Sequence, residues 1–214
     1  MHPTFVDALV ARREAPLGAV RAAAVLFVAA LTAAAAQVSA PLPFTAVPLT
    51  FQPMVVLLGG LALGPRLGMA SQLAYLTAGI VGLPVFAASA TLPPGALRLV
   101  GPTAGYLLSY PVAAFLVGYL AERGFDRRYL TSVLAMLLGL VVVYGCGVAW
   151  LAYFTSPISA DARIGLRAAL SAGAYPFVAS DVVKLLAAAG ILPGFWALLG
   201  RTDTRQGDRI DTRP

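Results

Sequence analysis

The sequence predicts an all-α integral membrane protein with six transmembrane helices, and three observations predict this fold class. Hydrophobic residues make up 59% of the 214 residues and charged residues 11%. The mean hydropathy is +0.83, far above that of a water-soluble domain. The apolar residues fall into successive runs, and a run of about 20 apolar residues spans a bilayer as a helix. Lipid is therefore the main solvent around this chain, which has room for one compact bundle.

Six apolar runs can each form one helix, and prolines, glycines or charges separate them. We expect the six spans at residues 20–39, 53–63, 67–83, 103–121, 130–154 and 171–199. The second and third runs are short, and Gly64-Pro65-Arg66 separates them, so we expect both helices to be tilted, kinked or partly re-entrant. Residues 41–52 and 84–102 contain several prolines and form two loops on the same side, and residues 155–170 form a third loop.

The first run has two interpretations that the sequence leaves open. Its alanine-rich core follows Arg12, Arg13 and Arg21 and ends in Val38-Ser39-Ala40, a pattern typical of a secretory signal with its cleavage site. The core is longer than that of an ordinary signal, which favours a retained transmembrane helix. A measurement of the intact mass distinguishes the two interpretations.

The placement of the arginines predicts how the chain is oriented in the membrane. Eleven arginines flank the runs on one side and three on the other, and the side with the excess is cytoplasmic. The first side holds Arg12, Arg13, Arg21, Arg66, Arg123, Arg127, Arg128, Arg201, Arg205, Arg209 and Arg213, and the second Arg98, Arg163 and Arg167. We therefore expect a cytoplasmic N-terminal segment (1–18), a six-helix membrane domain (19–200) and a polar cytoplasmic tail (201–214), with the proline-containing loops outside.

Several classes of function are excluded by residues that the sequence lacks. Cys146 is the only cysteine and His2 the only histidine, so the chain cannot form an internal disulfide, a cysteine or histidine metal cluster or a Ser-His pair. The arginines are scattered between apolar runs rather than gathered on one basic face, which argues against nucleic-acid binding. No GxxxxGK[ST] phosphate loop exists, and an intramembrane aspartyl enzyme needs a second inward carboxylate. We therefore expect no enzymatic activity in this chain.

Asp181 and Lys184 are the charged residues inside a predicted span. Lys184 is the only lysine of a chain that otherwise uses arginine for every positive charge. A charge inside a span is costly unless it is paired, and the i, i+3 spacing puts both side chains on one helix face. An ammonium and a carboxylate together can bind a small solute with both acceptor and donor groups. A structural ion pair that locks two helices together is the alternative.

Further candidate residues lie in the loops and at the ends of the spans. Arg98 is the only charge of its loop, and it can bind a ligand carboxylate or extend to lipid headgroups. Five aromatic residues can wall an apolar pocket or anchor the chain at the membrane interface. They are Phe86, Tyr106, Tyr110, Tyr175 and Phe177. The residues alone do not decide between a ligand and lipid headgroups for Arg98, or between a pocket wall and an interfacial anchor for the aromatic residues.

Four motifs, in order along the chain, resemble a known family. They are VPLTFQ at residues 47–52, GLPVFA at 82–87, GPTAGY at 101–106, and Pro176-Phe177 shortly before Asp181 and Lys184. This pattern resembles the biotin-specific substrate-binding subunits, or S components, of energy-coupling factor (ECF) transporters, which form the BioY family. The resemblance implies a six-helix S component that captures external biotin near the outer face, under a lid formed by the first loop.

The resemblance also implies roles for individual residues. Asp181 and Lys184 match the Asp-x-x-Lys of the family's last helix, which contacts biotin. The family contributes a polar residue, commonly an asparagine, from the loop after the third helix, where this chain has Ser89 and Thr91. The predicted substrate-binding residues are therefore Asp181, Lys184, Arg98, Phe86, Ser89, Tyr106, Tyr175 and Phe177.

The same resemblance implies partners. Ala22, Ala30 and Ala34 on the first helix resemble the small-residue face with which such subunits dock on a transmembrane coupling protein (T component). Two ABC-type ATPases would use ATP, so we expect no cofactor in this chain. We expect biotin uptake through the inner membrane of a bacterial or archaeal cell. An S component for another small vitamin, a solitary biotin transporter and a structural membrane subunit are the alternatives.

Overall fold

The computed structural model describes residues 4–5, 16–88, 92–93, 95–153 and 165–198. Its α-helices are α2 (Leu17–Gln37), α3 (Gln52–Leu63), α4 (Pro65–Ile80), α5 (Ala104–Ala121), α6 (Tyr129–Tyr153), α7 (Gly165–Gly173) and α8 (Tyr175–Ala188), and residues 191–198 are helical as well. The loops contain the 3-10 helix η1 (Ala96–Val100) and the short strands β1 (Ser39–Ala40) and β2 (Leu49–Thr50). β1 and β2 pair in antiparallel fashion.

Four helices within the described ranges are long and apolar enough to cross a membrane. They are Leu17–Gln37, Ala104–Ala121, Tyr129–Tyr153 and Tyr175–Leu198. α3, with 12 residues, and α4, with 16, are shorter, as the sequence predicted. Large apolar side chains cover the outside of the bundle, for example Leu26, Phe27 and Val141, which are 63%, 67% and 68% exposed. Such a surface is suited to contact with lipid.

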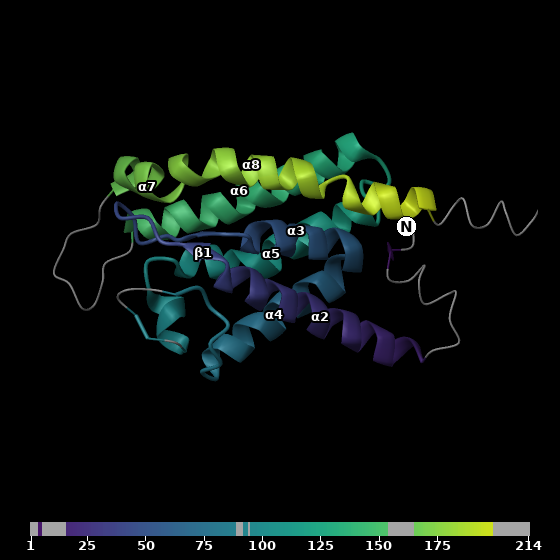
Figure 1. Cartoon of the computed structure of the whole chain (residues 1–214), viewed down its shortest axis with the longest axis horizontal. Coiled ribbons are helices and arrows are strands. Elements are labelled where there is room, and N and C mark those ends of the chain that lie inside the picture. Colours follow the sequence, from purple (N-terminus) through teal and green to yellow (C-terminus); the bar gives the residue numbers. More distant parts are fainter. Residues whose placement is uncertain (1–3, 6–15, 89–91, 94, 154–164, 199–214) are drawn as a thin grey trace, which may run out of the picture.

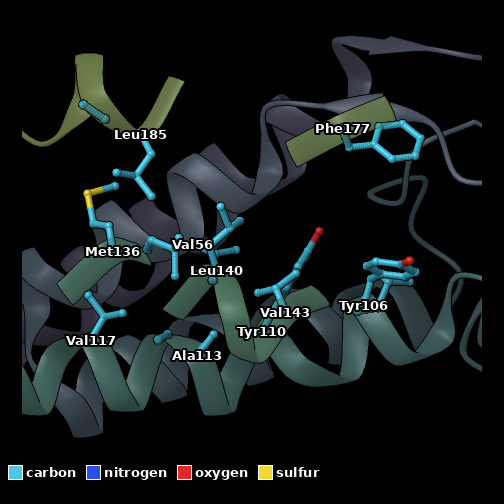
Figure 2. Close-up of a cluster of buried hydrophobic side chains, with 14 of the residues drawn as sticks. Val56, Tyr106, Tyr110, Ala113, Val117, Met136, Leu140, Val143, Phe177 and Leu185 are labelled. Carbon is cyan, nitrogen blue, oxygen red and sulfur yellow. The ribbon is translucent and has the colours of Figure 1, made fainter. Parts of the chain in front are cut away.

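α5 is the central helix of the bundle (Figure 1). It packs against α3, α4 and α6, while α2 packs against α3 and α4. α8 runs beside α6 and continues from α7. The apolar core follows α5, from Val117 and Met136 at one end to Tyr106 and Phe177 at the other (Figure 2). The second of these ends carries the candidate site.

The turn between α3 and α4 depends on two glycines, one in the turn itself and one on the neighbouring helix α5. Gly64 has φ +80°, a conformation that side chains rarely tolerate, and Pro65 begins α4, where the missing N–H of proline does no harm. Gly118 of α5 lies against this turn, and a Cβ there would come within 2.3 Å of the Gly64 carbonyl carbon. The absence of a side chain at residue 118 therefore brings α5 into direct backbone contact with the α3–α4 hairpin.

The C-terminal part of the fold differs from the expectation. The sequence predicted one span over residues 171–199 after a loop at 155–170, but residues 165–173 form α7, and a break at Ala174 (φ −125°, ψ −60°) separates α7 from α8. Pro176 lies in the first turn of α8. A continuous helix through Pro176 would lose a hydrogen bond and meet a steric clash, whereas a helix that starts there does not.

The described residues at the two ends of the chain lie together. The Phe5 ring packs against the rings of Phe195 and Trp196, with centroid distances of 5.4 Å and 5.9 Å. Both ends are therefore at the same end of the bundle (Figure 1). Most of the predicted segment 1–18, and all of the predicted tail 201–214, lie outside the described residues.

Candidate functional site

Asp181 and Lys184 form an ion pair on α8, as the sequence predicted. Nζ of Lys184 donates a hydrogen bond to Oδ1 of Asp181 at 2.9 Å, and the side chains of Lys184 and Asp181 are 13% and 8% exposed. Taking two charges out of water is costly, so a buried pair needs further hydrogen bonds to hold it. Other elements of the fold provide them.

Tyr144 of α6 holds the second oxygen of the carboxylate. Its hydroxyl donates to Oδ2 of Asp181 at 2.7 Å. Tyr144 was not among the site residues predicted from the sequence, although its position in the interior of an apolar span, rather than at the end, was a signal. A carboxylate has about four acceptor positions, and Lys184 and Tyr144 occupy one on each oxygen. Asp181 can therefore accept hydrogen bonds from a ligand as well.

Lys184 ties the first loop to α8. Its Nζ donates to the backbone carbonyl of Thr50 in β2 at 2.7 Å and lies 4.9 Å from the centre of the Phe51 ring. An ammonium has three N–H donors, and the Asp181 carboxylate and the Thr50 carbonyl accept two of them. Asp181 lies among the residues that line the adjoining cavity, and Lys184 does not.

The cavity lies between the first two loops and α5, α6, α7 and α8. It contains about 810 Å³ of space free of atoms, including the part that is open to the surroundings. Apolar side chains make up much of the wall, and polar groups stand at a few places. The polar or charged side chains among them are Thr50, Gln52, Arg98, Thr103, Tyr106, Tyr110, Tyr144 and Asp181.

Arg98 in η1 turns into the protein rather than toward lipid headgroups. The residue is 8% exposed, and it donates to the Ala87 carbonyl through Nη1 at 2.9 Å and to the Pro93 carbonyl through Nε at 3.0 Å. Burial lowers the pKa of the guanidinium, and the Tyr75 hydroxyl opposes this shift. An arginine nevertheless stays protonated in a protein. Arg98 thus brings a positive charge to the cavity wall.

Four of the five predicted aromatic residues line the cavity. Phe86, Tyr106, Tyr110 and Phe177 are all buried. The hydroxyl of Tyr106 donates to the carbonyl of Gly173 at 2.8 Å, which ties α5 to α7. The Tyr106 ring also packs edge-on against Tyr144, with a centroid distance of 6.3 Å. These contacts fix the apolar wall next to Asp181.

Among the described residues of the predicted site, Tyr175 is not part of this wall. Tyr175 is 68% exposed and is not among the residues that line the cavity, because it lies two residues before Phe177 and therefore about 200° around the helix from it. Ser89 lies outside the described residues.

The predicted docking residues lie on α2, away from the cavity. Ala22, Ala30 and Ala34 are exposed, while the buried residues of the helix, such as Val28 and Thr32, face the bundle. α2 therefore presents small residues on its outer surface. Among the described residues there is no group of three or more His, Cys, Asp or Glu side chains that could hold a metal ion.

Comparison with known proteins places this arrangement in a family. The sequence model of the BioY family matches residues 10–201. The chain belongs to the BioY family. This result confirms the resemblance carried by the four sequence motifs.

Individual BioY proteins and a solved structure are similar to the chain. A probable biotin transporter BioY of Pyrococcus horikoshii is 42% identical over 159 residues, which are 74% of this chain and 85% of that protein. The biotin transporter BioY of Thermotoga maritima is 38% identical over 149 residues, 69% of this chain and 80% of that protein. The crystal structure of the S component for biotin from an ECF-type ABC transporter is 25% identical, has a TM-score of 0.70, and is matched over 83% of this chain and 90% of its own. Together with the apolar helices, this makes the BioY chain a multi-pass membrane protein with an S-component fold.

Proposed function

We propose that the chain is the biotin-capturing S component of an ECF transporter. The observation that carries the proposal is a single cavity that combines a buried, tethered carboxylate, Asp181, with an apolar wall and the inward-facing cation Arg98. Biotin has a cyclic urea with two N–H groups and one carbonyl, an apolar ring system, and a carboxylate at the end of a flexible chain. The three features of the cavity match the three parts of this molecule.

In the proposed complex, Asp181 accepts a hydrogen bond from a urea N–H. Lys184 holds this carboxylate in place by its hydrogen bond, and it contacts the ligand directly when the ligand replaces the Thr50 carbonyl at Nζ. Phe86, Tyr106 and Phe177 surround the rings. Arg98 binds the terminal carboxylate with the guanidinium hydrogens that Ala87 and Pro93 leave free. The predicted contribution of Ser89 belongs to the same proposal, whereas Tyr175 lies outside the cavity lining.

Transport requires partners, because the chain has no phosphate-binding loop of its own. We propose a T component that docks on the exposed alanines of α2 and two ABC-type ATPases that hydrolyse ATP. The chain crosses the inner membrane six times, with α3 and α4 as two short spans and both termini in the cytoplasm. The cavity then opens toward the outside, and the ends that meet at Phe5 and Trp196 lie inside.

Equilibrium binding of labelled biotin to the purified chain tests the proposal. We expect saturable binding by the wild type and a loss of affinity of about 10- to 100-fold in Asp181→Asn, because hydrogen bonds to a charged group are the strong ones. Asp126→Asn is the matched control. Asp126 is another buried carboxylate, bonded by Trp196 at 2.7 Å and paired with Arg127 at 3.6 Å, but it is not among the residues that line the cavity.

Two outcomes would contradict the proposal. One is a wild-type protein that is folded and binds no biotin at saturating concentrations. The other is an equal loss of affinity in Asp181→Asn and Asp126→Asn, since a structural role of the ion pair, rather than ligand contact, predicts that result.

A further inference from the structure

Tyr110 of α5 places a hydroxyl group in the cavity that no described residue satisfies. The residue is 4% exposed and lines the cavity. Figure 2 shows its hydroxyl directed away from α5, toward the space between Tyr106 and Phe177. The structure gives it no hydrogen-bond partner among the described residues. A hydroxyl that lines a cavity and has no partner in the surrounding fold is available to a ligand as a hydrogen-bond donor.

Three other tyrosines in or near the cavity wall differ in this respect. The Tyr75 hydroxyl accepts a bond from Nε2 of Gln52 at 2.6 Å. Those of Tyr106 and Tyr144 donate to the Gly173 carbonyl and to Asp181. The fold therefore supplies partners for these three phenols and leaves the fourth facing the cavity.

The hydrogen-bond donors near Asp181 indicate a role for the Tyr110 hydroxyl. A cyclic urea presents an N–H and a carbonyl oxygen on the same edge, so a site that recognises it needs an acceptor and a donor close together. Asp181 is the acceptor. Two of the three N–H groups of Lys184 bind Asp181 and the Thr50 carbonyl, and Lys184 lies outside the cavity lining. Tyr110 lies in that lining, and so does Asp181.

We infer that Tyr110 is a specificity-determining residue, whose hydroxyl donates a hydrogen bond to the carbonyl oxygen of the ligand's urea while Asp181 accepts a bond from the neighbouring N–H. The inference rests on the proposed function, since it assumes that the ligand is biotin. It adds a named donor on α5 to the acceptor on α8. Ligands that lack an acceptor at this atom cannot accept this hydrogen bond.

The test compares Tyr110→Phe with the wild type for three ligands. Biotin and desthiobiotin share the urea carbonyl, whereas 2-iminobiotin has in its place a guanidinium group, which is protonated at neutral pH and offers only N–H donors. We expect the variant to bind biotin and desthiobiotin about 5- to 10-fold more weakly, as for the loss of one neutral hydrogen bond. For 2-iminobiotin we expect a change of less than about twofold. Tyr119→Phe, a change at an exposed ring outside the cavity lining, should leave all three affinities unaltered.

Thermal melting of the ligand-free protein separates recognition from packing. Since Tyr110→Phe keeps the ring and removes a hydroxyl that has no partner, its melting temperature should equal or exceed that of the wild type. A lower melting temperature together with an equal loss of affinity for all three ligands would mean a structural role and would overturn the inference. Unchanged biotin affinity in the variant would overturn it as well, while the proposed function would stand. If the wild type bound no biotin, both would fail.

Discussion

The Asp181 carboxylate is held by side chains that come from two helices. Lys184 approaches one oxygen from the same helix, and Tyr144 approaches the other from α6. Each bond restricts the rotation of the carboxylate, so a ligand meets an acceptor that is already oriented. Because the acceptor is already ordered, binding loses less conformational entropy.

Tyr144 should therefore contribute to affinity without being the acceptor itself. We expect Tyr144→Phe to weaken biotin binding about 10-fold, since a hydrogen bond to a charged group is lost and the carboxylate becomes less ordered. Titration calorimetry on the purified variant measures this. Tyr129→Phe is the control, because its hydroxyl also joins α6 to α8, by a bond of 3.1 Å to the Leu186 carbonyl, but it is not among the residues that line the cavity. An equal effect of both substitutions would contradict the role of Tyr144.

Arg98 should act on the other end of the ligand. Arg98→Gln removes the charge that we assign to the carboxylate, so we expect a loss of about 10-fold or more for biotin and a much smaller loss for biotinamide, which has no carboxylate. Competition binding with both ligands measures the two losses. Equal losses would show that Arg98 acts through its bonds to the Ala87 and Pro93 carbonyls, which hold the loop.

At the scale of the elements, close backbone contact holds α5 against the α3–α4 hairpin. A methyl group at Gly118 would meet backbone atoms of Gly64 and Pro65 within 2.6 Å, and backbone cannot move aside as a flexible side chain can. We expect Gly118→Ala to destabilise the protein by about 1–3 kcal/mol. Gly145→Ala, where a Cβ has nothing within 4 Å, should be neutral or stabilising because alanine favours a helix. Melting temperatures in detergent measure both, and equal values would contradict the packing argument.

The sequence predicted the helices well and the contacts between them poorly. Hydropathy located helices in all six apolar runs, because burial in lipid leaves a strong mark on composition. It did not predict α7 or the break at Ala174, since α7 is short and only moderately apolar. Asp181 and Lys184 could be predicted because they are neighbours on one helix. The partner Tyr144 is 37 residues away, and no local pattern specifies that contact.

At the scale of the whole molecule, the cavity and the two described ends of the chain lie at opposite ends of the bundle. The cavity lies where Tyr106 and Phe177 end the core, and Phe5 and Trp196 meet beyond its other end (Figures 1 and 2). With the termini in the cytoplasm, as the arginines predict, the cavity faces outward. A solute can then enter it from outside.

Reporter fusions test this orientation. We expect a green fluorescent protein fused to either terminus to fluoresce, and an alkaline phosphatase fused at the same positions to be inactive, because the first folds in the cytoplasm and the second needs the oxidising exterior. Active phosphatase at both termini would show that the chain has the opposite orientation. The cavity would then open inward, which contradicts capture of external solute.

The central claim is that biotin binds the native protein through the Asp181 carboxylate. The most direct measurement is the shift in melting temperature that saturating biotin produces in the wild type, Asp181→Asn and Asp126→Asn, since a ligand that binds only the folded form must raise it. We predict a clear rise in the wild type and in Asp126→Asn, and little or none in Asp181→Asn at the same biotin concentration. No rise in the wild type, or an equal rise in Asp181→Asn, would contradict the claim.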